Sequence, residues 1–182
     1  MFPAIFLDRD GVIIENRPDY VRSWTDVELF PQAVAALKRL SLSPYRIIVV
    51  TNQSAVGRGI MSLEQAQRIN QQLVAELEKL QCRIDRIYLC PHPPEVQCVC
   101  RKPKPGLILQ AAQELTIDLT RSIMIGDAWS DLQAGHAAGI PHVRLVLTGR
   151  GKAQQALPKP PDLTNIAIYN TLADALGDVP SA

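Results

Sequence analysis

The chain has 182 residues, 47% of them hydrophobic, which suits a single domain over residues 1–182 with a substantial core. Its 19 basic and 18 acidic side chains leave a net charge of +1, so neither nucleic acid nor a membrane surface is an expected partner. No apolar stretch is long and charge-free enough to cross a bilayer, and the N-terminus lacks the pattern of a secretory signal. We therefore expect a cytoplasmic monomer.

The first half of the chain alternates strand and helix patterns. An apolar run predicts a first strand over 4–7, and Pro31 can open the helix that follows the next polar loop. The Ile-Ile-Val-Val run predicts a second strand over 46–50, of the kind that is buried on both faces of a sheet. Ser62 and Gln65 then form a capping-box pattern before a long amphipathic helix.

The second half continues the same alternation. A third strand over 84–89 leads into an insert rich in proline and cysteine, and Pro105 opens another helix. A fourth strand over 122–125, a short alanine-rich helix and a fifth strand over 142–147 follow, and a last strand and helix occupy 166–176. Because strands and helices alternate without an internal repeat, the sequence predicts an α/β fold with a doubly wound, Rossmann-like parallel sheet.

Polar side chains follow three of the predicted strands at the point where each strand ends. In chain order they are Asp8 and Asp10, Thr51 and Asn52, and Asp127 with Asp131. The carboxyl ends of parallel strands meet at one edge of a sheet, so these side chains should converge. One such cluster would be an ordinary turn, but three favour a common site. Lys102 precedes a helix on the same side and would supply a cation.

The order of these motifs carries a resemblance to a known family. Asp-Arg-Asp-Gly at 8–11, Thr-Asn-Gln-Ser at 51–54, Arg-Lys-Pro at 101–103 and Gly-Asp-x-x-x-Asp at 126–131 resemble the haloacid dehalogenase superfamily of phosphohydrolases. The cysteine-rich insert further resembles one branch, the D-glycero-D-manno-heptose 1,7-bisphosphate 7-phosphatases, whose near relatives include histidinol-phosphate phosphatases. The resemblance implies a phosphorylated sugar as substrate and a short loop cap over the site.

The resemblance also implies roles for the residues at the strand ends. Asp8 would attack phosphorus to form an aspartyl-phosphate, and Asp10 would protonate the leaving oxygen and then activate water. Mg²⁺, which prefers hard oxygen ligands, would be held by Asp8, the backbone carbonyl of Asp10 and Asp127. A side-chain ligand role for Asp10 is the alternative. Thr51 and Lys102 would hold the transferring oxygens, one by hydrogen bond and one by charge.

The role of Asp131 stays open. It could ligate the metal, act as a hydrogen-bond partner of a ligand, or only place a charge at a helix N-terminus, and we favour the second. On the substrate side we expect contacts from Asn16, Asp19, Asn52, Gln53, Ser54 and Arg101.

The insert over 90–100 has the composition of a metal site. Cys90, His92, Cys98 and Cys100 offer three sulfurs and one imidazole, a set that tetrahedral Zn²⁺ takes in structural sites. The alternative is a group of packed cysteines beside a surface histidine. Cys82 stands apart and is expected to be packed.

A metal-tied loop would have a consequence for the neighbouring cations. Arg101 and Lys102 follow the last cysteine of the insert directly, so the loop would hold both over the site with little conformational freedom. We expect Arg101 to recognise a second anionic group on the substrate, with a solvent-exposed side chain as the alternative.

Four functions compete for this pattern. A sugar-phosphate phosphatase leads, and a phosphatase for histidinol phosphate or another small metabolite would share the same catalytic residues. A polynucleotide 3′-phosphatase is disfavoured because the chain has no basic stripe. A non-catalytic, zinc-stabilised binding module is disfavoured because the expected nucleophile, acid, lysine and metal ligand are all present.

Overall fold

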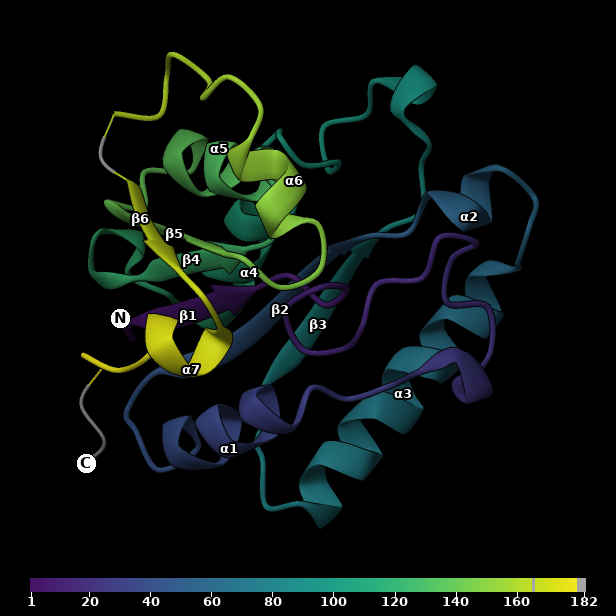
Figure 1. The fold of residues 1–182 in the computed structure, drawn as a ribbon, viewed down its shortest axis with the longest axis horizontal. Helices are drawn as coiled ribbons and strands as arrows, with labels where there is room; N and C mark the ends of the chain where they lie inside the picture. Colours follow the sequence, from purple (N-terminus) through teal and green to yellow (C-terminus); the bar gives the residue numbers. More distant parts are fainter. Residues whose placement is uncertain (165, 180–182) are drawn as a thin grey trace.

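The computed structural model describes residues 1–164 and 166–179 and contains one parallel sheet of six strands (Figure 1). The strands are β1 (Ala4–Leu7), β2 (Arg46–Asn52), β3 (Arg86–Cys90), β4 (Ile123–Gly126), β5 (His142–Val146) and β6 (Ile166–Tyr169). Their order across the sheet is β3-β2-β1-β4-β5-β6, and every neighbouring pair is parallel. The predicted doubly wound α/β fold is therefore confirmed.

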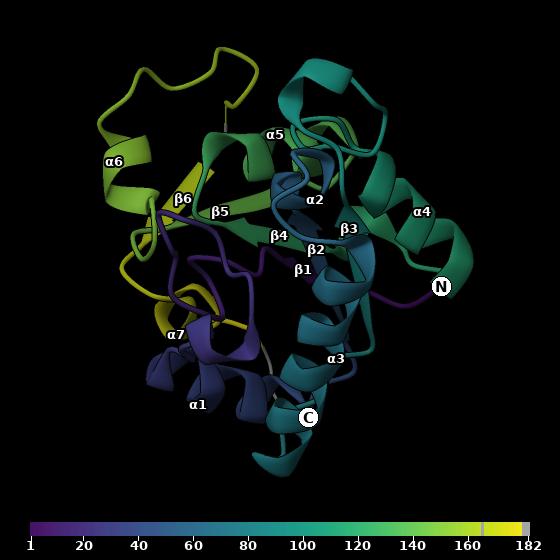
Figure 2. The same cartoon turned by 90° about the vertical axis from the view of Figure 1, so that its right-hand side faces the viewer.

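Helices cover both faces of this sheet. They are α1 (Pro31–Leu40), α2 (Ser54–Gly57), α3 (Leu63–Lys79), α4 (Gly106–Leu115), α5 (Trp129–Ala137), α6 (Gly151–Gln155) and α7 (Leu172–Ala175). Short 3-10 turns lie at Trp24–Asp26, Pro94–Val96 and Leu119–Arg121. Figure 2 shows α1, α3 and α7 on one side of the sheet and α4 on the other. In the part of the chain described here, no helix is long and apolar enough to span a membrane.

The strands are apolar on both faces because each face packs against helices. In β1, Ile5 and Leu7 point into the core shared with α1, α3 and α7, while Ala4 and Phe6 point into the core shared with α4 and α5. All four side chains are fully buried, as expected when successive side chains alternate between two covered faces.

Two of the predicted helix starts are confirmed, while α4 begins at Gly106, one residue after the predicted Pro105. Pro31 is the first residue of α1, where its missing N–H costs no hydrogen bond. At the start of α3, Ser62 Oγ accepts from Gln65 N at 3.0 Å, and Gln65 Oε1 accepts from Ser62 N at 2.8 Å. α6 is not among the predicted helices, because five residues are too few to show a helical period.

Several strand boundaries differ from the prediction, by at most two residues, and β2 and β3 differ most. β2 runs past 46–50 to Asn52, since the ladder with β3 continues that far. β3 begins later than predicted, because the Asp85 carboxylate accepts the backbone N–H of Ile47 at 2.7 Å and takes the place of a strand carbonyl. Thr51 and Asn52 therefore belong to the hydrogen-bonded ladder between β2 and β3, which fixes the direction of their side chains.

The strand order reverses between β1 and β4. In open α/β sheets the crevice beyond the carboxyl ends of such strands is the usual ligand site. The residues that follow β1, β2 and β4 converge there.

Candidate active site

Three buried carboxylates gather beyond the ends of β1 and β4. Asp8 follows β1, Asp127 follows β4 and Asp131 lies in α5, and a carboxylate oxygen of each lies within 4.8 Å of the others. They are at most 4% exposed. Glycines make this approach possible: a Cβ at Gly11 would lie 2.1 Å from Asp127 Oδ2, and one at Gly126 would lie 2.2 Å from Asp131 Cβ.

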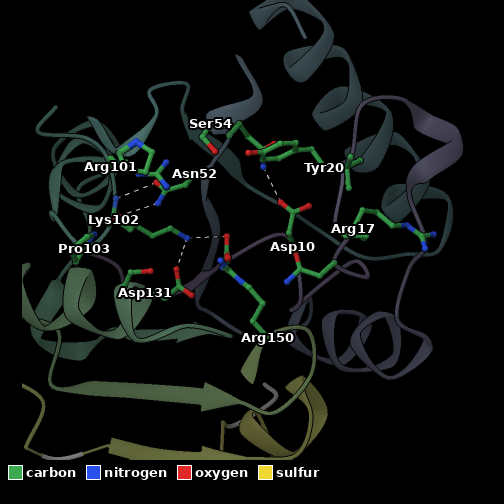
Figure 3. A pocket seen from close by; sticks show the side chains of 17 residues that line it. Asp10, Arg17, Tyr20, Asn52, Ser54, Arg101, Lys102, Pro103, Asp131 and Arg150 are labelled. Carbon is green, nitrogen blue, oxygen red and sulfur yellow. Dashed lines mark hydrogen bonds and ion pairs between the residues drawn. The ribbon is translucent and has the colours of Figure 1, made fainter. Parts of the chain in front are cut away.

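Lys102 lies between two of these carboxylates (Figure 3). Its Nζ is 2.9 Å from Asp8 Oδ1 and 2.7 Å from Asp131 Oδ1, and it donates to the Val50 carbonyl at 2.7 Å. Burial disfavours the charged ammonium, but the two carboxylates outweigh it and raise the pKa of Lys102. The Asn52 side chain donates to the Lys102 carbonyl and accepts from its backbone N–H, both at 3.1 Å, so β2 fixes the position of the lysine.

Burial is the largest influence on the pKa values of Asp8 and Asp127. It raises the pKa of Asp8 to about 7, with Lys102 opposing and the neighbouring aspartates adding to the shift. It also raises the pKa of Asp127, although the Arg150 guanidinium, 3.0 Å from Asp127 Oδ1, counters part of the effect. Asn16 Nδ2 donates to Asp127 Oδ2 at 2.9 Å. An added positive charge would therefore stabilise the ionised form of these carboxylates.

Asp10 lies apart from this cluster. Its carboxylate accepts from Gln53 Nε2 at 2.9 Å, and the same amide donates to Thr51 Oγ1 at 2.8 Å. Asp131 also has both oxygens engaged, since Oδ2 accepts from Ala128 N at 3.0 Å while Oδ1 faces Lys102. Asp8 and Asp127 each keep one oxygen without a backbone or lysine contact: Asp8 Oδ1 accepts from Arg9 N and Asp127 Oδ2 accepts from Arg150 N, both at 2.8 Å, whereas Asp8 Oδ2 and Asp127 Oδ1 do not.

A cavity of about 630 Å³ opens over these groups (Figure 3). Among the predicted residues, those that line it are Asp8, Asp10, Asn16, Asn52, Gln53, Ser54, Arg101, Lys102 and Asp131. Thr51 and Asp127 are almost fully buried and are not among its lining residues. Asp19 is exposed and is not among the lining residues, so the structure does not bring it to the cavity.

Sequence reasoning missed several residues of the cavity. Arg17 and Tyr20 come from the polar loop after β1, Ser130 from α5, and Arg150 from the loop before α6. The loop segments that carry Arg17, Tyr20 and Arg150 follow no helical or strand period, so no pattern in the sequence assigns these side chains a direction. A run of polar residues after a strand end, as at Arg17, is the one signal that could have drawn attention to them.

The four residues of the Cys/His cluster come together. In five of the six pairs among Cys90, His92, Cys98 and Cys100, the sulfur and Nδ1 atoms lie 3.1–3.7 Å apart, all four lie within 4.8 Å of one another, and the cysteines are not in disulfides. Ligands bound at about 2.0–2.3 Å around a tetrahedral zinc would lie roughly 3.5–3.8 Å apart, close to these separations. Cys82 is buried away from this group, as expected.

The loop that carries this cluster contacts the site from two directions. The Arg101 guanidinium donates to the His92 carbonyl at 3.0 Å. On the other side, Gln53 N donates to the Cys90 carbonyl at 2.8 Å and Gly57 N donates to the Pro91 carbonyl at 2.9 Å. The loop therefore touches both the cationic wall and the segment after β2.

Comparison with known proteins decides the family. A family model described as HAD-hydrolase-like matches residues 99–175. A D-glycero-beta-D-manno-heptose-1,7-bisphosphate 7-phosphatase from Photorhabdus laumondii is 36% identical over 187 residues, covering 99% of this chain and 94% of that protein. The chain belongs to the haloacid dehalogenase superfamily of phosphatases.

Other relatives agree with this assignment. An enzyme of the same name from Helicobacter pylori J99 is 44% identical over 146 residues, covering 80% of this chain and 83% of the relative. The structure of a D,D-heptose 1,7-bisphosphate phosphatase from B. bronchiseptica, complexed with magnesium and phosphate, superposes with a TM-score of 0.89 at 30% identity, covering 97% of each chain. The haloacid dehalogenase phosphatase therefore resembles the heptose bisphosphate branch along almost its whole length.

Proposed function

We propose that this phosphatase removes the 7-phosphate of D-glycero-D-manno-heptose 1,7-bisphosphate, a step in making heptose precursors of lipopolysaccharide or other surface glycans. The observation that carries the proposal is the Asp8–Lys102–Asp131 group at the base of a cavity whose wall includes three arginines. The names of the relatives with similar sequences supply the substrate class. The proposal takes residues 1–182 as one domain that acts in the cytoplasm.

In the proposed reaction, a carboxylate oxygen of Asp8 attacks phosphorus and displaces the sugar oxygen. Asp10 lines the same cavity and donates a proton to that departing oxygen. Asp10 then takes a proton from water, which attacks the phosphorus of the aspartyl-phosphate and regenerates the Asp8 carboxylate. Phosphate and a heptose monophosphate are the products.

The donor set fits a magnesium ion. Asp8 Oδ2 and Asp127 Oδ1 are buried carboxylate oxygens that accept no backbone N–H, and such oxygens are hard ligands of the kind that Mg²⁺ prefers. These two residues and the Asp10 carbonyl would hold it, and the bound ion would supply positive charge next to the transferring phosphoryl group. Both carboxylate oxygens of Asp131 are engaged, one by Lys102 and one by Ala128 N, which favours a role as a partner of Lys102 over a role as a metal ligand.

Protein groups would hold the phosphoryl oxygens as well. The Thr51 hydroxyl oxygen accepts from Gln53, which leaves its proton to donate to a phosphoryl oxygen. Lys102 already directs its three N–H groups at Asp8, Asp131 and Val50, so its contribution is the positive charge it holds beside the nucleophile. Asn52 keeps that charge in place.

The cavity wall favours a bisphosphate over histidinol phosphate. Arg17, Arg101 and Arg150 all line the cavity. A second phosphate carries negative charge and would pair with a guanidinium through charge-assisted hydrogen bonds. Histidinol phosphate would instead bring an ammonium group toward these arginines, and like charges repel.

The Cys/His cluster is proposed as a structural zinc site. A closed set of four protein ligands leaves no position for substrate, and the cluster lies outside the cavity lining. Its role would be to hold the loop that ends in Arg101 and Lys102.

Phosphate release from a substrate panel tests the proposal. The panel holds both anomers of heptose 1,7-bisphosphate, histidinol phosphate and a 3′-phosphorylated oligonucleotide, with ³¹P NMR to identify the phosphate that is lost. We expect the highest kcat/KM with a heptose bisphosphate and retention of the phosphate at C1. Preference for histidinol phosphate would move the assignment to that activity. Absence of turnover on every substrate, with both metals supplied, would favour the binding module.

A further inference from the structure

Arg9 is a buried arginine between two aspartates of the site, and the reaction proposed above gives it no role. Its side chain is 1% exposed. A buried guanidinium is costly unless its N–H groups find partners. Nε and Nη2 donate to the two oxygens of Asp10, each at 3.1 Å, and Nη1 donates to Asn70 Oδ1 at 2.7 Å. Arg9 therefore links the carboxylate of Asp10 to α3.

The contact between Arg9 and Asp10 is a planar fork. Two parallel N–H groups meet the two carboxylate oxygens, and this geometry restrains both the position and the rotation of the carboxylate. A lysine would supply charge at a single point and leave the carboxylate free to turn. The fork therefore does more for Asp10 than neutralise it.

Asn70 fixes the fork from the opposite side. It is 7% exposed and lies on the core-facing side of α3 with Ala66, Ile69 and Leu73, where an apolar residue would be expected. Its hydrogen bond to Arg9 joins residues 61 positions apart, so the sequence pattern of the helix does not account for it. A polar side chain at this core-facing position packs less favourably than an apolar one would.

Gln53 completes the arrangement. Its amide donates at 2.9 Å to Asp10 Oδ2, the oxygen that also accepts from Arg9 Nε, and it donates to Thr51 Oγ1 as well. Asp10 thus receives donors from Arg9 and Gln53, while its side chain stays 19% exposed toward the cavity. The carboxylate is thus held by three protein donors and still reaches the cavity.

We propose that Arg9 is a positioning residue for the Asp10 carboxylate, and that Asn70 acts through Arg9 from α3. This inference rests on the proposed function, because it assumes that Asp10 transfers the proton to the leaving oxygen. Proton transfer requires hydrogen-bond reach and alignment, so a carboxylate that turns freely gives a slower chemical step with substrate binding unchanged.

Substrates with different leaving groups distinguish a positioning role of Arg9 and Asn70 from a merely structural one. A sugar alkoxide is a poor leaving group and needs the proton, whereas p-nitrophenolate departs without one. Loss of alignment at Asp10 slows transfer from the sugar phosphate more than the first release of p-nitrophenolate from p-nitrophenyl phosphate. A general loosening of the fold slows both.

The experiment compares Asn70→Ala with Asn70→Asp, which retains an acceptor for Arg9, and with Gln72→Ala at an exposed position of the same helix. Arg9→Lys, which keeps charge without the fork, serves as the second variant. We expect Asn70→Ala and Arg9→Lys to lower kcat on heptose bisphosphate roughly tenfold. KM and the pre-steady-state burst of p-nitrophenolate should stay within about twofold. Asn70→Asp should restore most of kcat, and Gln72→Ala should match wild type.

Equal losses on both substrates, a change in KM alone, or wild-type kcat in both Asn70→Ala and Arg9→Lys would overturn the inference. Asp10→Asn, measured alongside, separates it from the proposed function. If Asp10→Asn turns over the sugar phosphate normally, the proposed acid is wrong. If Asp10→Asn is inactive while the two positioning variants behave as wild type, only the positioning role is wrong.

Discussion

Removal of the Arg101 guanidinium should weaken recognition of a second phosphate. Arg101 lines the cavity next to Lys102, and its hydrogen bond to the His92 carbonyl orients it there. A hydrogen bond to a charged group contributes about 1.5–3 kcal/mol. Arg101→Ala should therefore lower kcat/KM for heptose bisphosphate roughly ten- to a hundredfold, mainly through KM, because the lost contact is made before and during the reaction alike.

Steady-state kinetics on heptose bisphosphate and on a simple sugar monophosphate measure this effect. The monophosphate has no second dianion, so its kcat/KM should change much less. Arg58→Ala is the matched control, since Arg58 pairs with Glu95 near the same loop but does not line the cavity. Equal losses on both substrates in Arg101→Ala would refute the reasoning and assign Arg101 to the reacting phosphate or to the fold.

Three further changes probe the metal sites and the loop. Wild type should carry about one equivalent of zinc per chain, and Cys98→Ser should lower both this zinc content and Tm. The control Cys82→Ser should keep the zinc. Elemental analysis that finds no zinc in wild type would reject the site. In metal-free protein, the raised pKa of Asp8, about 7 against 3.8 for an ordinary aspartate, means that the folded state binds more protons than the unfolded state between these values. Wild type should therefore lose stability relative to Asp8→Asn as pH rises through this window, by at most about 1.4 kcal/mol per pH unit, and a Tm difference that does not vary with pH would contradict this. Gly57→Ala places a Cβ 2.4 Å from Pro93 Cδ and 2.8 Å from the Pro91 carbonyl, so it should displace the loop that carries the Cys/His cluster and reduce kcat/KM. In the control Gly59→Ala, the Cβ meets nothing within 4 Å, so only stability should fall, because of the positive φ. Wild-type kinetics in Gly57→Ala would show that the position of this loop does not affect the reaction.

Several of the residues that sequence reasoning found share one property: each lies at the end of a strand or directly after one. Asp8, Asn52 and Asp127 follow apolar runs long enough to predict buried strands, and the geometry of a parallel sheet then brings them together. Cys90, at the end of β3, belongs to the same class. For these residues, local pattern and sheet topology are sufficient.

The residues that were missed depend on contacts between distant segments. Arg9 finds Asn70 on α3, and Arg150 returns from the loop after β5 to reach Asp127. Nothing in either local pattern predicts such a pairing, because it arises only when the helix or loop has packed. Asp19 shows the converse: it lies in the correct polar loop, but the backbone turns it toward solvent.

Detection of a phosphoryl group on Asp8 tests the central claim most directly. Wild-type protein is mixed with heptose bisphosphate, quenched in acid within the first turnover, digested and analysed by mass spectrometry. The account predicts phosphate on the peptide that contains Asp8, and neither phosphopeptide nor turnover in Asp8→Asn, whose amide keeps the shape of the side chain but cannot attack. Turnover by Asp8→Asn within tenfold of wild type, or phosphate on a different residue, would contradict it.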